Sequence, residues 1–397
     1  MNGHHAVFIS NRDEARGFLE KIGASPPGIE YMLPKAVFRC LKLKDIPSRA
    51  ANLIKQEMLA KGGEAAVAKN VAVGEGSSDV LLLGTLRQYQ LLIEKLKLQP
   101  FGLRALAEEI ENILLALENK SGNLKLPHGR VLEFGQKTLI MGILNVTPDS
   151  FTDGGRYLNT DAAVAHALEM KAEGADIIDV GGASSRPDST MAAAEEELKR
   201  ILPVIKKLAQ EDIIISVDTF RAEVARQVLA EGAHIINDIG GLQLDHELAG
   251  VLAEWQSPAV LMHNRLQLNQ GQPYFDLIAD IIAELSNSID TAVAAGLPLE
   301  QIIIDPGLGF GKSVAENRLL IKNLQDFKSL GRPILLGASR KAFIGRTLGL
   351  EVEERLEGSL AAVALGIMNG ADIVRVHDVK QSKRVAQMTD AVRNEYG

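Results

Sequence analysis

From residue 138 onward, short apolar runs alternate with longer stretches in which apolar positions recur every three or four residues. The first run, Thr138–Leu144, is almost continuously aliphatic, which is typical of a parallel strand covered on both faces by helices. Seven more such runs follow, at Asp176–Val180, Ile213–Val217, His234–Ile236, Ala259–Met262, Gln301–Ile304, Ile334–Gly337 and Ile373–Val376. The pattern therefore predicts eight strands, each followed by a helix.

The stretches between these runs have the period of amphipathic helices. Helices are predicted at Ala162–Glu173, Ala192–Leu208, Ala222–Glu231, Asp245–Trp255, Phe275–Ala295, Val314–Leu324, Leu356–Met368 and Gln381–Asn394. Eight such units over roughly 260 residues match the size of a closed (β/α)8 TIM barrel. A doubly wound open sheet is the alternative, but it typically has fewer strands and a Gly-rich first turn. We expect an α/β fold with the barrel at residues 130–397.

Residues 1–125 have a different pattern, which predicts a smaller α+β domain. Strands are predicted at Ala6–Ser10, Val37–Leu43 and Asp79–Leu83, and helices at Asp13–Ile22, Arg49–Lys61, Thr85–Leu98 and Gly102–Glu118. A turn is expected at residues 25–28, Ser48 is a candidate N-cap, and residues 119–129 have the composition of a linker. The polar residues of this domain form no recognisable catalytic set, and its role is unknown.

Composition narrows the classes of protein. Hydrophobic residues make up 46% of the 397, enough for a large core, and the net charge of −8 argues against a nucleic-acid or membrane-surface partner. Cys40 is the only cysteine, so a disulfide framework is excluded. No apolar run reaches the ~18 residues of a membrane span, and no signal-peptide core is evident at the start. We expect a cytoplasmic protein.

Polar residues follow nearly every predicted strand: Asn145, Arg186, Asp218, Asn237, His263, Asp305, Lys341, Arg375 and His377. In a barrel the carboxyl ends of all eight strands gather on one face, where barrel enzymes place their chemistry. Each residue also has a simpler explanation, since Asp218 and Asp305 can cap the following helices and Arg375 can pair with an acid. Recurrence at so many strand ends favours a functional site.

The residue types indicate what this face binds. Asp218, Asn237, Asp305 and Lys341 supply two carboxylates, an amide and an ammonium, which suit the donor and acceptor edge of an aminopyrimidinone ring. Arg375 and His377, two residues apart on the last strand, point to the same side and suit an anion. The Gly-rich residues 307–313 resemble a phosphate loop, but Pro306 stands where that motif begins with glycine. We interpret them as a tight turn.

These motifs together resemble the dihydropteroate synthase family. The resemblance is carried by MGILNVTPDSFTDGG (141–155), GADIIDVGGASSRP (174–187), SVDTF (216–220), INDI (236–239), DPGLGFGK (305–312), GASRKAFIG (337–345) and GADIVRVHDV (370–379). It covers about residues 130–397. It implies a transferase of folate biosynthesis that joins 6-hydroxymethyl-7,8-dihydropterin diphosphate to p-aminobenzoate and releases diphosphate, with Mg²⁺ as cofactor and a homodimer as the usual assembly.

The resemblance also implies roles for individual residues. Asp218, Asn237, Asp305 and Lys341 would hold the pterin. Asn145, Arg375 and His377 would hold the diphosphate and its Mg²⁺, with Asn145 as the metal ligand. Phe151, Ser185, Arg186 and Phe310 would surround p-aminobenzoate. Asp218, Lys341, Arg375 and His377 would be the catalytic residues.

The chain departs from the family pattern at Ala183, Ser185, Asn264 and Ala342, mostly on the expected arylamine side. A different arylamine acceptor therefore stays open. Two other functions are alternatives on the same fold. One is a methyltetrahydrofolate-dependent corrinoid methyltransferase, which has no need for Arg375 and His377 as an anion-binding pair. The other is a non-catalytic pterin-binding protein.

Overall fold

The computed structural model describes residues 3–118, 122–146, 156–182, 193–266, 268 and 272–395. The chain divides between Glu118 and Asn119 into two compact units. Each unit has its own hydrophobic core, and each is described separately below. Among the described residues, no helix combines the length and apolar character needed to cross a bilayer.

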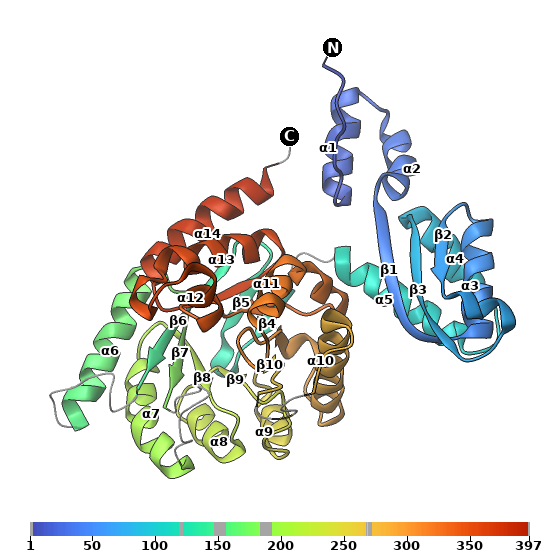
Figure 1. Ribbon diagram of the computed structural model, residues 1–397. Helices are drawn as coiled ribbons and strands as arrows, with labels where there is room; N and C mark the ends of the chain where they lie inside the picture. The colour runs from blue at the N-terminus through green and yellow to red at the C-terminus, as the bar shows by residue number, and fades with distance from the viewer. Residues whose placement is uncertain are drawn as a thin grey trace. The chain divides into compact units, whose positions relative to one another are not determined.

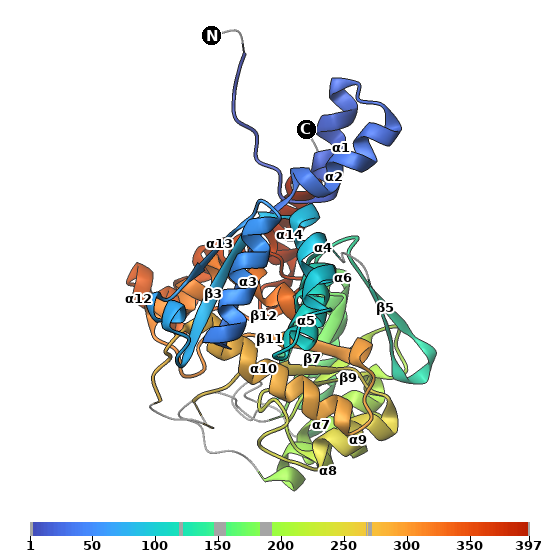
Figure 2. The same ribbon diagram turned by 90° about the vertical axis from the view of Figure 1, so that its right-hand side faces the viewer.

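The N-terminal unit is built on a small antiparallel sheet of order β1-β3-β2. Its strands are β1 (Phe38–Pro47), β2 (Glu64–Val67) and β3 (Ser77–Thr85), and its helices are α1 (Arg12–Ile22), α2 (Pro26–Ala36), α3 (Ser48–Ala60), α4 (Leu86–Leu96) and α5 (Leu103–Glu118). Helices α3 and α4 contact β3, as Figure 2 shows for α3. Ile54, Met58, Leu82 and Tyr89 are completely buried between these elements.

Four local predictions for this segment are wrong. Residues 6–10 form no strand, and residues 25–28 begin helix α2 rather than a free turn. Proline favours the first turn of a helix because its missing N–H would be unpaired there, so Pro26 and Pro27 start α2. Ser48 lies inside the first turn of α3 and donates to the Glu75 carbonyl oxygen at 2.7 Å, while Pro47 occupies the N-cap position. The expected linker contains a strand, described below.

The second unit contains eight parallel strands in the order β11-β10-β9-β8-β7-β6-β13-β12 (Figure 1). They are β6 (Leu139–Asn145), β7 (Ile177–Gly181), β8 (Ile214–Asp218), β9 (Ile235–Asp238), β10 (Ala259–Met262), β11 (Ile302–Asp305), β12 (Leu335–Leu336) and β13 (Ile373–Val376). A parallel bridge between Ile304 and Ile334 joins the two ends of the sheet. The predicted barrel is confirmed, and its strands lie within one or two residues of the predicted bounds.

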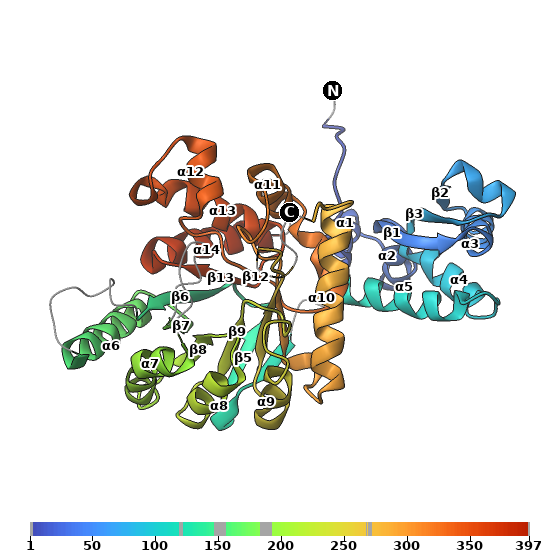
Figure 3. The ribbon, with the colours of Figure 1, turned by 60° about the horizontal axis from the view of Figure 1, so that its bottom comes forward.

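Helices surround the strands of this barrel (Figure 3). They are α6 (Arg156–Ala172), α7 (Ala194–Leu208), α8 (Ala222–Ala230), α9 (Leu248–Trp255), α10 (Leu277–Ala294), α11 (Val314–Lys322), α12 (Ala342–Leu348), α13 (Leu356–Met368) and α14 (Val379–Asn394). Helix α12 was not predicted. Completely buried side chains such as Ile201, Val228, Leu252 and Phe327 fill the space between helices and strands.

A hairpin of β4 (Gly122–Lys125) and β5 (Val131–Phe134) precedes the barrel. Leu124, Leu126, Leu132 and Phe134 of this hairpin share one buried cluster with side chains from inside the barrel. Those interior side chains lie near the beginning of the strands, as Leu139 and Ile177 do. The hairpin therefore packs against the amino-terminal end of the barrel, and the segment predicted to be a linker belongs to the core.

The interior of the barrel changes from apolar to polar along the strands. The buried interior cluster includes Ile177, Ile235, Ile303, Leu335 and Ile373. Side chains two positions apart on a strand point to the same face, and the residues two positions further on are Asp179, Asn237, Asp305, Gly337 and Arg375. An apolar layer thus lies directly below a polar layer at the carboxyl ends of the strands, where barrel enzymes place their sites.

Candidate active site

Arg375 is the centre of the polar layer. Its Nε donates to Oδ2 of Asp179 at 2.6 Å, and its Nη2 donates to Oδ2 of Asp218 at 2.9 Å. These three residues come from β13, β7 and β8, so the strand order that closes the sheet brings them together. The predicted proximity of Asp218 and Arg375 is therefore observed, across 157 positions of sequence.

Asp179 was not among the predicted site residues. It is completely buried, and its Oδ2 accepts from Nδ2 of Asn237 at 3.1 Å as well as from Arg375. Its Oδ1 has no hydrogen-bond partner within the part of the chain that the structure describes. The sequence signal was present, because a charged residue interrupts an otherwise apolar strand two positions after an inward-facing isoleucine. Asp179 lies inside the predicted strand Asp176–Val180, whereas the predicted site residues other than Arg375 follow the ends of their strands.

Asn237 has a defined orientation because of this contact. With Nδ2 donating to Asp179, the amide oxygen is directed away from that carboxylate. Neighbouring residues are also in register, since Asn145 pairs with Gly181, Gly181 with Asp218, and Asp218 with Asn237. These residues of four successive strands therefore lie at one level near the barrel rim.

Asp305 and Lys341 lie on the other side of the layer. Oδ1 of Asp305 accepts from the backbone N–H of Gly307 at 2.7 Å. The Lys341 ammonium donates to the carbonyl oxygen of Leu308 and lies 4.9 Å from the centroid of the Phe310 ring. The loop after β11 therefore contributes both an acceptor and an aromatic face to Lys341.

The helix-cap explanation of the two aspartates is excluded. The N-cap of α8 is Arg221, and the N-cap of α11 is Ser313, whose side chain forms a capping box with Glu316. Neither Asp218 nor Asp305 caps the following helix. Asp218 instead pairs with Arg375, and the charges of Lys341 and Lys312 act on the Asp305 carboxylate.

Burial shifts the pKa values of these groups. It raises the pKa of Asp218 to about 7, against the opposing effect of Arg375, and it raises the pKa of Asp305 with Lys341 opposing. Burial lowers the pKa of Lys341 to about 8, although Asp305 counteracts it. The pKa of Arg375 is raised despite its burial, because Asp179 and Asp218 both stabilise its charge. Such perturbed groups around a barrel mouth are typical of an active site.

The remaining predicted residues are placed in part. Asn145 ends β6 and is exposed, and His377 follows β13 with its Nδ1 3.0 Å from Oγ of Ser339. Phe151, Ser185 and Arg186 lie outside the described residues. Among the residues that are described, no three His, Cys, Asp or Glu side chains come together as a metal site.

A glycine leaves space between two oxygens of the rim. A Cβ atom at Gly181 would lie 3.7 Å from Oδ1 of Asn145 and 3.9 Å from Oδ2 of Asp218. Glycine therefore keeps the space between these oxygens open. Mg²⁺ prefers oxygen ligands and commonly shares one or two protein oxygens with substrate phosphates and water. The oxygen of Asn145 fits such a shared site.

Comparison with known proteins agrees with this geometry. A model of the pterin binding enzyme family matches residues 141–377. This range includes all eight barrel strands except the first two residues of β6. The chain is also 50% identical to the dihydropteroate synthase of Bacillus subtilis over 267 residues, which are 67% of this chain and 92% of that protein.

Two further relatives extend the comparison. A probable bifunctional folylpolyglutamate synthase/dihydropteroate synthase of Halobacterium salinarum is 40% identical over 390 residues, or 97% of this chain, which spans 46% of that longer protein. A solved structure of Xanthomonas albilineans dihydropteroate synthase with 4-aminobenzoic acid superposes with a TM-score of 0.65 and 42% identity. It covers 69% of this chain and 99% of the solved one.

Proposed function

This chain belongs to the pterin binding enzyme family, and we propose that its barrel catalyses the dihydropteroate synthase reaction. In this reaction the amine of p-aminobenzoate displaces diphosphate from 6-hydroxymethyl-7,8-dihydropterin diphosphate. The observation that carries the proposal is the polar layer, in which Asp218, Asn237 and Arg375 lie within hydrogen-bonding distance of one another or of Asp179. Similarity to dihydropteroate synthases over nearly their whole length supports it.

In the proposed complex the pterin ring occupies the barrel mouth. Asp218, or Asp305 across the layer, accepts from the ring N–H and amino groups, as a carboxylate can accept two parallel hydrogen bonds. The amide oxygen of Asn237, directed away from Asp179, is a further acceptor for ring donors. Lys341 donates to a ring carbonyl or nitrogen. A ligand with such an edge satisfies buried charges that would otherwise be costly.

The anion site accounts for the leaving group. The guanidinium of Arg375 keeps one bond to Asp179 through Nε when a ligand takes Asp218, so Nη2 becomes available to a diphosphate oxygen. His377 is the neighbouring candidate donor. The C–O bond breaks with its electron pair leaving on diphosphate, and the positive charge left on the pterin methylene is stabilised by the carboxylates beneath it.

The lone pair of the arylamine nitrogen then forms the C–N bond, and the nitrogen loses a proton. Phe310, with Phe151, Ser185 and Arg186, is proposed to line the arylamine site. Exclusion of water from the arylamine site would protect the cationic intermediate, because water competes with the amine. Mg²⁺, held in part by Asn145, would neutralise diphosphate charge.

The two alternative functions lack a use for the anion site. Transfer of a methyl group from a folate to a corrinoid, or simple pterin binding, requires no second cationic group beside the pterin carboxylates. The synthase substrate brings its own anion, which Arg375, beside Asp218 at the rim, is proposed to contact. We also propose a homodimer, because α13 and α14 contact each other and leave Leu365, Met368, Met388 and Val392 about half exposed or more. Light scattering tests the dimer.

One assay separates the functions. The full chain is mixed with the pterin diphosphate, Mg²⁺ and p-aminobenzoate, and both diphosphate and dihydropteroate are measured. The proposal requires equal amounts of the two products. Pterin binding without diphosphate release would support the non-catalytic alternative, and methyl transfer from methyltetrahydrofolate would support the methyltransferase.

The expected cytoplasmic location is a proposal that cell fractionation tests.

A further inference from the structure

The Gly-rich loop after β11 packs directly on the loop after β10. Gly307 and Gly311 have positive φ angles of 69° and 71°. A Cβ atom at Gly307 would overlap the carbonyl oxygen of His263, and one at Gly311 would lie 2.8 Å from the backbone carbon of Arg265. Glycine is required here because the two backbones touch. The resemblance of this run to a phosphate loop thus has a packing explanation.

Lys312, at the end of this loop, points back into its own turn. Its Nζ donates to the carbonyl oxygens of Gly307 at 2.8 Å and Phe310 at 3.1 Å, and lies 2.9 Å from Nδ1 of His263. Three acceptors match the three protons of an ammonium group. Burial lowers the pKa of Lys312 to about 7, with Asp305 opposing the shift. Its donors are therefore used within the protein rather than offered to a phosphate.

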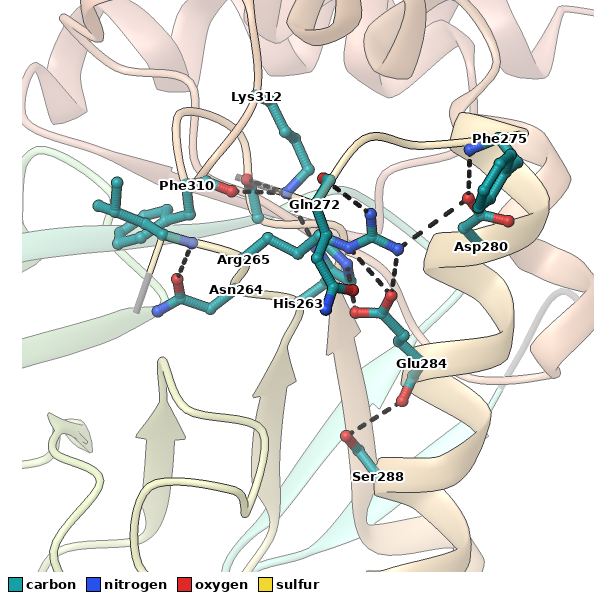
Figure 4. Close-up of polar contacts among 12 residues, drawn as sticks. His263, Asn264, Arg265, Gln272, Phe275, Asp280, Glu284, Ser288, Phe310 and Lys312 are labelled. Carbon is teal, nitrogen blue, oxygen red and sulfur yellow. Dashed lines mark hydrogen bonds and ion pairs between the residues drawn. The ribbon is translucent and has the colours of Figure 1, made fainter. Parts of the chain in front are cut away.

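His263 connects Lys312 to helix α10 (Figure 4). When Lys312 is protonated its ammonium only donates, so Nδ1 of His263 is the acceptor and the ring proton is on Nε2. Burial lowers the pKa of His263 to about 4, so the ring is neutral near pH 7. Nε2 lies 3.0 Å from Oε2 of Glu284, a close contact bent away from hydrogen-bond alignment.

Glu284 fixes the far end of this arrangement. Its Oε1 accepts from Nε and Nη2 of Arg265 at 3.0 and 2.5 Å. Burial alone would raise the pKa of Glu284, but its contacts with His263 and Arg265 lower it to about 2, so the carboxylate is ionised. A continuous polar chain therefore runs from α10 through the β10 loop into the β11 loop.

The end of this chain reaches the proposed active site. Leu308, whose carbonyl oxygen accepts from Lys341, lies between the two residues whose carbonyls Lys312 holds. Phe310, whose ring faces the Lys341 ammonium, is itself one of those two residues. Lys312 spans the loop from Gly307 to Phe310, so loss of its bonds would free the segment that supports Lys341.

We propose that Glu284, His263 and Lys312 are positioning residues that hold residues 307–312 in the conformation required by Lys341 and Phe310. The three do not contact Lys341 themselves within the hydrogen bonds described, and act through the loop. The consequence for catalysis rests on the proposed function, whereas the consequence for the loop does not. The experiment below measures the two separately.

The full-length chain is compared with Lys312→Met, Glu284→Gln and a control, Ser288→Ala. Ser288 is buried one turn from Glu284 on α10 and donates only to the Glu284 backbone carbonyl, so the control removes a polar group from the same helix face. Amide hydrogen exchange over residues 306–312 reports on the loop without any substrate. Diphosphate release gives kcat and KM for p-aminobenzoate.

Lys312→Met removes all three bonds of the ammonium. It should speed exchange over residues 306–312 and lower kcat/KM by at least about tenfold, the effect of losing a single hydrogen bond to a charged group. Glu284→Gln should also speed exchange and lower kcat/KM, each by a smaller factor, and it should raise KM for p-aminobenzoate. If Lys312→Met does not fold, the Glu284→Gln variant alone tests the proposal. Ser288→Ala should match the wild type.

Unchanged exchange over residues 306–312 in both variants would overturn the proposal. So would a lowered unfolding free energy with wild-type kcat/KM, which is the result for residues that only stabilise the fold. If the wild type itself releases no diphosphate with p-aminobenzoate, the proposed function fails, while the exchange measurement still decides whether the chain holds the loop.

Discussion

Asp179→Asn is the substitution that tests the polar layer most directly. Oδ2 of Asp179 accepts from Nε of Arg375 at 2.6 Å and from Nδ2 of Asn237 at 3.1 Å, and the side chain is completely buried. Asparagine preserves the shape but removes the charge. Its amide also adds two protons to a site where both neighbours of Oδ2 are donors.

The geometry sets the magnitude. If the asparagine oxygen takes the place of Oδ2, the new NH2 group is buried where Oδ1 has no described partner. If the NH2 group takes the place of Oδ2 instead, it faces Nε of Arg375 and Nδ2 of Asn237, which are both donors. Either orientation weakens a charge-assisted bond, which contributes about 1.5–3 kcal/mol. We expect the free energy of unfolding to fall by about 2 kcal/mol and kcat/KM to fall about 10- to 30-fold, because Arg375 and Asn237 lose a shared anchor.

Urea denaturation followed by tryptophan fluorescence measures the first quantity. Trp255 is the only tryptophan and lies in α9, so its signal reports on the barrel unit. Asp161→Asn is a matched control, because Asp161 forms an exposed ion pair with Lys207 and such pairs contribute little. An Asp179→Asn protein within about 0.5 kcal/mol of the control, with wild-type kcat/KM, would refute the assigned role.

Three further predictions concern the predicted site residues. Asp218→Ala should abolish pterin binding, since the carboxylate is the proposed acceptor, and calorimetry showing unchanged affinity would contradict this. Arg375→Ala should raise KM for the pterin diphosphate by at least about tenfold, and an unaltered KM would remove it from the anion site. The profile of kcat/KM against pH should be bell-shaped: it rises as Asp218 ionises through about pH 7 and falls as Lys341 loses its proton above about pH 8. A flat profile from pH 6 to 9 would show that the ionisation of Asp218 and Lys341 does not control kcat/KM.

The barrel could be predicted because its strands are buried on both faces. The continuous apolar run Ala259–Met262 matches β10 to the residue, and Ile373–Val376, apolar apart from Arg375, matches β13. Once eight strands form one ring, the position of a residue after a strand fixes its place on the rim. The meeting of Asp218 with Arg375 followed from topology alone, while the assigned roles of both residues stay predictions.

What was missed depends on contacts that local patterns do not show. Residues 119–129 have the Ser, Gly, Asn and Pro content of a linker, yet Leu124 and Leu126 are buried against the barrel interior. Their burial is decided by a distant surface that the hairpin covers. Asp179 is visible in the sequence as a charge within an apolar strand, but its place in the site depends on its contacts with Arg375 and Asn237, which come from other strands.

The same interior geometry explains why the site should favour a ligand with two kinds of group. Arg375 is bonded to Asp179 and Asp218, and a ligand that donates to Asp218 takes away one of those two carboxylates. A buried cation that loses a partner carries a desolvation cost. An anionic group on the same ligand offsets that cost, because it supplies the guanidinium with new acceptors at the moment Asp218 is occupied. A pterin diphosphate brings both groups, whereas a free pterin brings one. If Asp218 and Arg375 have the proposed roles, the ion pair at the rim acts as a template for the donor edge and the anion of a single substrate.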